Sequence, residues 1–117
     1  MVYVKVDESI HTAIISGRMQ DKEWDNRECK MVTIRTDFAT MDSLLTDGTP
    51  WSIVIEDEVI TTDEEGNEVT ETRQTEYDNS EFSIRGDLTV HVDGTCTVKM
   101  GKLTELEEAY EIMLGGI

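Results

Sequence analysis

Apolar and polar residues alternate along most of this chain, which predicts β-strands with one face in a core and one face in solvent. The first such strand is expected from Val2 to Val6, and a second follows from Ile10 to Ser16. A third is expected from Met31 to Thr36, where β-branched residues are frequent. Residues 18–30 mix charges without a period and therefore predict a loop.

The middle of the chain predicts a long β-hairpin. Residues 51–60 form the longest strand candidate, and residues 61–74 run back antiparallel to them. The connection is an acidic turn that contains Gly66, which adopts positive φ without steric cost. Trp51, at the start of this hairpin, is expected to anchor the core.

The C-terminal third predicts a second hairpin. Residues 82–85 are expected to form a strand, and residues 88–92 continue with alternating polarity. Asp93-Gly94 is a strong two-residue turn signal, and residues 96–100 alternate on the return.

Two helices complete the pattern. Asp37 is the expected N-cap of a short helix over about residues 38–46. Thr104 and Glu107 form a capping box that starts a second helix over about residues 104–114. Because an isolated helix of this length is marginal in water, we expect its apolar stripe to pack on the sheet. The stripe contains Leu103, Leu106, Ala109, Tyr110, Ile112 and Met113.

These elements predict an α+β fold: a mainly antiparallel sheet of six to eight strands, one short helix and one packed C-terminal helix. The length of 117 residues predicts a single domain over residues 1–117. No run of 18 apolar residues is present, so no membrane partner is expected. The N-terminus lacks the zones of a signal peptide, and Cys29 and Cys96 are expected to be free thiols rather than a disulfide.

Charge is distributed unevenly. The chain has a net charge of −16, and residues 56–81 alone hold eleven acids against one base, Arg73. Arg73 is expected to lie across the hairpin from Asp57 or Glu58, where an opposite-charge pair helps to set the register. Strand pairing is also expected to crowd the other carboxylates of the hairpin. Such a charge repels nucleic acid and anionic surfaces, so the expected partner is a protein with a basic surface.

The residues expected to bind that partner are the acids of the hairpin and one tryptophan: Glu56, Asp57, Glu58, Asp63, Glu64, Glu65, Glu68, Glu71 and Trp24. Trp24 lies in a charged segment, where it is either a half-buried plug or a binding anchor. The simpler alternative is that the acidic hairpin only increases solubility and binds no partner.

Catalytic chemistry is not indicated. The two histidines, His11 and His91, lie in predicted strands without a neighbouring nucleophile. Cysteines and histidines do not occur at the short spacings of zinc sites, and the acids do not form an EF-hand loop. We therefore expect a chain that is not an enzyme and that uses no cofactor and no metal.

Four segments resemble small acidic proteins of phages and prophages in gut-type Firmicutes. They are Trp51-Ser52-Ile53-Val54, residues 77–84, the Asp93-Gly94-Thr95 turn and residues 98–107. The resemblance implies a structural or protein-interaction module, with a tail-associated role as one form of it, located in the host cytoplasm or on the virion. The alternative is an acidic decoy that imitates nucleic acid and inhibits a host nucleic-acid-binding or defence protein such as a CRISPR effector.

Overall fold

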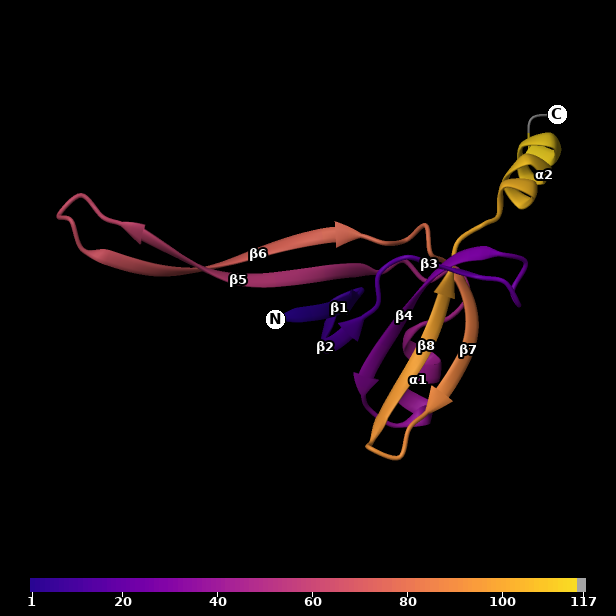
Figure 1. The fold of residues 1–117 in the computed structure, drawn as a ribbon, viewed down its shortest axis with the longest axis horizontal. Coiled ribbons are helices and arrows are strands. Elements are labelled where there is room, and N and C mark those ends of the chain that lie inside the picture. The colour runs from indigo at the N-terminus through magenta and orange to yellow at the C-terminus, as the bar shows by residue number, and fades with distance from the viewer. Residues whose placement is uncertain (116–117) are drawn as a thin grey trace.

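A computed structural model describes residues 1–115 and confirms the α+β fold, with an antiparallel sheet of eight strands and two helices (Figure 1). The elements in chain order are β1 (Val2–Val6), β2 (Ser9–Ile15), β3 (Met19–Asp21), β4 (Arg27–Arg35), α1 (Phe38–Leu44), β5 (Ser52–Thr62), β6 (Glu68–Asp78), β7 (Ile84–Val90), β8 (Thr95–Gly101) and α2 (Glu105–Gly115).

The strand order is β6-β5-β1-β2-β4-β8-β7, with β3 attached to β4. Strand β2 links the two halves of the sheet. Residues 9–12 of β2 pair with β1, and residues 13–15 pair with β4. As a result, the β5–β6 hairpin runs across the direction of β4, β8 and β7 (Figure 1).

The core lies between the inner face of this sheet and helix α1. Met41 and Leu45 from the helical segment are 0% exposed, and the expected N-cap is confirmed because Asp37 Oδ1 accepts a hydrogen bond from Thr40 N at 2.7 Å. Trp51 is 2% exposed, and its Nε1 donates to the carbonyl of Phe82 at 2.9 Å. The prediction that Trp51 anchors the core is confirmed.

The chain is much more extended than a compact protein of its length. Its radius of gyration is 18.0 Å, whereas a compact chain of this size has about 13 Å. The principal extents are 62 × 42 × 26 Å. Two elements cause the difference, since the β5–β6 hairpin and α2 leave the body in different directions (Figure 1).

Helix α2 forms as predicted, but its predicted packing on the sheet is wrong. The capping box is present: Thr104 N donates to Glu107 Oε1 at 2.9 Å, and Glu107 N donates to Thr104 Oγ1 at 3.2 Å. The apolar stripe is nevertheless in solvent, with Leu106 81% and Met113 68% exposed. The physical reason is that α1 already closes the core. An amphipathic pattern shows that a face is apolar but not which surface covers it.

Three smaller predictions are corrected. Residues 18–30 are not all loop, because they contain β3 and the start of β4. Arg27 and Cys29 are buried at alternate positions of β4, but the many charged residues of this segment obscure the strand pattern in the sequence. Phe82 lies in the turn before β7 and is fully buried. Val92 lies in the β7–β8 turn and is fully exposed.

Both cysteines, Cys29 and Cys96, are free and buried. Between residues 1 and 115, none of the helices has the length and apolar character needed to cross a bilayer.

Candidate interaction surfaces

The distal part of the β5–β6 hairpin projects from the body as an arm, defined here as residues 57–73. The backbone N–H of Glu56 still donates to the carbonyl of Met1 at 2.9 Å, and on the returning strand Lys5 pairs with Glu76 at 3.0 Å. Beyond these contacts, every residue of the arm except the half-buried Val59 is exposed. The six residues that β5 adds after Glu56 extend about 20 Å.

The tip of the arm is organised by one carboxylate. Asp63 Oδ1 accepts hydrogen bonds from the backbone N–H of Glu65 at 3.0 Å and of Asn67 at 2.8 Å. Gly66 has φ +86, as the turn requires. Asp63 is therefore a turn-forming residue, while the side chains of Glu64 and Glu65 are exposed at the tip.

The register of the hairpin corrects the expectation that its carboxylates oppose one another. Asp57 faces Arg73 across the hairpin, which confirms the predicted cross-strand position of Arg73. Each remaining acid on the two strands also faces a residue that is not acidic. The pairs are Glu56–Gln74, Glu58–Thr72, Glu71–Val59, Glu68–Thr62, Glu76–Val54 and Asp78–Ser52. Gln74 Nε2 additionally donates to Glu56 Oε2 at 2.8 Å. The arm thus holds its acids without direct like-charge pairs.

An uncharged belt divides the acids of the arm into two groups. The belt consists of two adjacent cross-strand pairs, Ile60–Thr70 and Thr61–Val69. Ile60 is 66% exposed and Val69 is 37% exposed. The acids toward the tip and those toward the body lie on either side of it. The carboxylates therefore do not form a continuous row along the arm, and apolar side chains are presented between them.

Trp24 lies apart from the arm, so the structure does not unite it with the eight acids. It is half-buried in the turn between β3 and β4. Its indole covers Gly86 of β7 and Gly101 of β8 so closely that a Cβ added at either glycine would lie 2.9 Å or less from the ring. Strands β7 and β8 are at the opposite end of the strand order from β5 and β6. Of the two interpretations of Trp24, a half-buried residue that fills a gap in the body agrees with this position.

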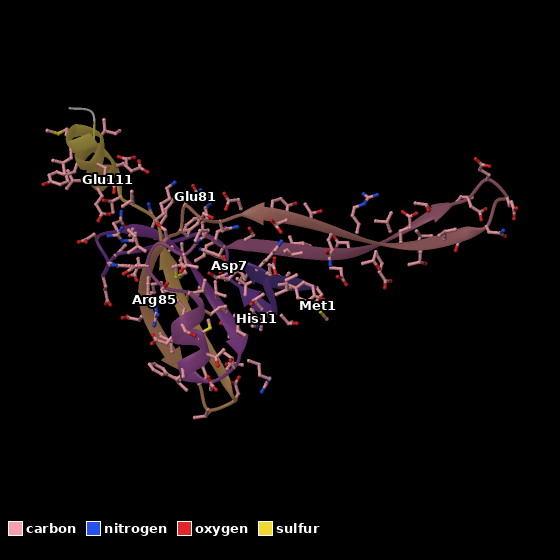
Figure 2. All side chains as sticks on the ribbon, turned by 180° about the vertical axis from the view of Figure 1, so that it is seen from behind. Met1, Asp7, His11, Glu81, Arg85 and Glu111 are labelled. Carbon is pink, nitrogen blue, oxygen red and sulfur yellow. The ribbon has the colours of Figure 1, made fainter. Side chains whose placement is uncertain are left out.

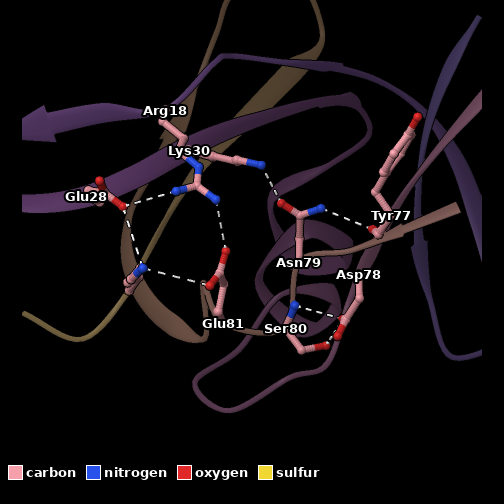
Figure 3. A network of polar contacts seen from close by, with 9 residues as sticks. Arg18, Glu28, Lys30, Tyr77, Asp78, Asn79, Ser80 and Glu81 are labelled. Atoms are coloured by element: carbon pink, nitrogen blue, oxygen red, sulfur yellow. Dashed lines mark hydrogen bonds and ion pairs between the residues drawn. The ribbon is translucent and has the colours of Figure 1, made fainter. Parts of the chain in front are cut away.

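A polar network joins the body end of the hairpin to the segment before α2 (Figure 3). Arg18 contacts Glu28 at 3.6 Å and Glu81 at 3.3 Å, and Lys102 contacts the same two carboxylates at 3.8 Å. Beside this network Lys30 Nζ donates to Asn79 Oδ1 at 2.5 Å. Burial, reinforced by the nearby Arg18, lowers the pKa of Lys30. No local sequence pattern indicates this network, because its members are far apart along the chain.

A single arginine fixes the first turn of α2 to the body. Arg27 is 4% exposed and lies 4.9 Å above the Trp24 ring. Its guanidinium donates to Glu107 Oε1 at 2.6 Å, to Glu107 Oε2 at 3.1 Å and to the carbonyl of Lys102 at 2.9 Å. Sequence reasoning assigned Glu107 only to the capping box. The partner Arg27, 80 residues away, was missed.

This anchor predicts an acid-sensitive contact. The hydrogen bonds from Arg27, followed by the bond from Thr104 N, lower the pKa of Glu107 from 4.5 to about 2. A lowered pKa means that the contribution to stability is complete above pH 4.5 and is lost as pH falls through about 2. We expect the Glu107 carboxyl to titrate near 2 by carbon-detected NMR, and to move back toward 4.5 in Arg27→Met. An unshifted Glu107 in the parent would contradict the anchor.

Most basic side chains are occupied by such contacts. Six of the ten pair with carboxylates: Lys5, Arg18, Arg27, Arg85, Lys99 and Lys102. The arm holds seven acids and one base, and α2 holds four acids and no base, so these two elements carry −10 of the net charge of −16.

Within residues 1–115, no three His, Cys, Asp or Glu side chains converge in a way that suits a metal ion. Comparisons with protein-family profiles, with curated proteins and with solved structures found no match to this chain.

Proposed function

We propose that this chain is a non-enzymatic protein-interaction module that grips a partner protein with its arm. The observation that carries the proposal is an 11-pair hairpin whose distal part is exposed on both faces and along both edges. An isolated two-stranded hairpin is at best marginally stable in water. A hairpin of this kind gains most stability when a partner covers it, and the fold of the body does not require it.

The chemistry of the arm indicates the chemistry of the partner. Ile60 and Val69 belong to successive cross-strand pairs and therefore point to opposite faces of the arm, so each face offers one apolar side chain. The acids on either side of the belt favour basic residues around these apolar side chains. The resemblance to small acidic phage proteins makes other virion proteins, including those of the tail, the first partners to test. We place the protein in the host cytoplasm or on the virion accordingly.

The second candidate is the acidic decoy, which the charge of residues 56–81 favours. A decoy would bind through its carboxylates alone, so the uncharged belt should not matter for its affinity. The two candidates therefore differ in which side chains of the arm hold the partner.

Three variants of the full chain separate the candidates. The first replaces residues 59–71 by Asn-Gly, which closes a two-residue turn between the paired Glu58 and Thr72. The second changes the belt by Ile60→Thr with Val69→Thr. The third replaces Glu64, Glu65, Glu68 and Glu71 by glutamine. All three variants should have the same melting temperature as the parent, because the residues that they change lie outside the core.

The readout is capture of proteins from a lysate of the producing cell, followed by affinity measurement with the identified partner. The interaction module predicts no capture by the shortened arm and about tenfold weaker binding by the belt variant, since two apolar contacts are worth at least 1.4 kcal/mol. The decoy predicts loss in the glutamine variant and no effect of the belt. Capture of the same partner by the shortened arm would overturn both.

A further inference from the structure

Helix α2 presents an apolar stripe that nothing in residues 1–115 covers. Leu106, Tyr110 and Met113 follow one another at helical spacing and are 81, 62 and 68% exposed. Leu114 extends the stripe and is 61% exposed. Contiguous exposed apolar side chains on a helix are typical of a docking surface.

The rest of the helix surface carries only negative charge. The helix contains Glu105, Glu107, Glu108 and Glu111 and has no lysine or arginine from Glu105 to Gly115. At 100° per residue, Glu107 and Glu111 follow one side of the stripe and Glu105 the other. Leu103, Leu106 and Tyr110 line a groove together with Glu107 and Glu111. The stripe is therefore bordered by carboxylates.

The helix is held in a defined position without being packed. Arg27 binds Glu107 with two hydrogen bonds at the first turn, and Figure 2 shows Glu111, one turn later, far from Arg85 in the body. The free part of the helix is thus directed away from the core. A helix with a fixed base loses less conformational entropy on binding than a disordered segment does.

We propose that α2 is a docking helix for a separate partner protein, received in an apolar groove bordered by Lys and Arg side chains. This inference concerns an element other than the arm and does not depend on the proposed function of the arm. If both hold, the chain connects two protein surfaces.

Charge disfavours the other possible occupants. A second copy would bring another net charge of −16 and four further acids to the same contact, which opposes self-association. Helices that lie on membranes carry lysine and arginine on the polar face, whereas this polar face is acidic.

The test uses two synthetic peptides with the same amphipathic helical pattern, one of leucine and lysine and one of leucine and glutamate. Fluorescence anisotropy measures their binding to the full chain. We expect the Leu/Lys peptide to bind and the Leu/Glu peptide not to bind. Leu106→Ser with Met113→Ser should weaken binding about tenfold, because two apolar contacts are lost. Glu105→Gln together with Glu111→Gln should weaken it and reduce its salt dependence.

Two controls make the result specific. Ile112 is 73% exposed, and although the sequence pattern assigned it to the stripe, it lies about 120° around the helix from Leu106. Ile112→Ser should therefore leave the affinity nearly unchanged. The glutamine variant of the arm should retain the part of the binding that depends on the stripe. Unchanged affinity in the Leu106/Met113 variant overturns the proposal. The proposal is also overturned if the parent chain forms a dimer in sedimentation velocity and the Leu106/Met113 variant does not. It is likewise overturned if the parent chain binds phosphatidylcholine vesicles and this variant does not.

Discussion

Trp51→Ala is expected to lower the free energy of unfolding by about 3–5 kcal/mol, the usual cost of deleting a large buried aromatic side chain. Trp51 is 2% exposed and belongs to the cluster that joins α1 to the sheet. The substitution leaves a cavity and also removes the donor that satisfies the carbonyl of Phe82. Both effects act at the point where the long hairpin starts, so the whole body should be destabilised.

Urea unfolding monitored by circular dichroism measures this change, and Leu106→Ala is the matched control. Leu106 is as apolar as a core residue but is 81% exposed, so its truncation should change the free energy of unfolding by about 0.5 kcal/mol or less. A large loss in Leu106→Ala would show that α2 packs on its own body. A loss below about 1 kcal/mol in Trp51→Ala would contradict the core described above.

Gly101→Ala is expected to cost about 1–3 kcal/mol, although it adds only one methyl group. A Cβ at this position would lie 2.5 Å from Cδ of Arg27 and 2.8 Å from the Trp24 ring. Neither neighbour can give way without loss, because Arg27 is buried and holds Glu107 while Trp24 stacks on Arg27. The variant should therefore also loosen the base of α2.

Gly17→Ala is the control, since a Cβ there meets nothing within 4 Å and the position has no positive φ. It should change the free energy of unfolding by about 0.5 kcal/mol or less. In Gly101→Ala the pKa of Glu107 should also rise from about 2 as the ion pair weakens. Equal stability of the two alanine variants would contradict the packing of Trp24 and Arg27 against Gly101.

Local patterns predicted the elements of this fold because local chemistry determines them. Alternation located every strand except β3, and the acidic turn with Gly66 placed Asp57 opposite Arg73. The caps at Asp37 and Thr104 located both helix starts. These signals involve residues within a few positions of each other or joined by one turn.

The predictions that failed concern contacts between distant segments. Nothing near α2 in the sequence indicates that α1 covers the core first, so the stripe of α2 appeared to need the sheet. Arg27 and Glu107 meet across 80 residues, and no local pattern connects them. The expected crowding of the hairpin carboxylates does not produce directly opposed pairs, because in this register each acid faces a neutral or basic residue.

The central claim is that the arm and α2 are presented to partners and lie outside the cooperative core. Native-state hydrogen exchange on the isolated chain tests it directly. We expect amides in residues 57–73 and 108–114 to exchange through openings of much lower free energy than global unfolding, while amides of β4 and β8 exchange only with global unfolding. Protection of the arm and of α2 as strong as that of β4 and β8 would contradict the claim.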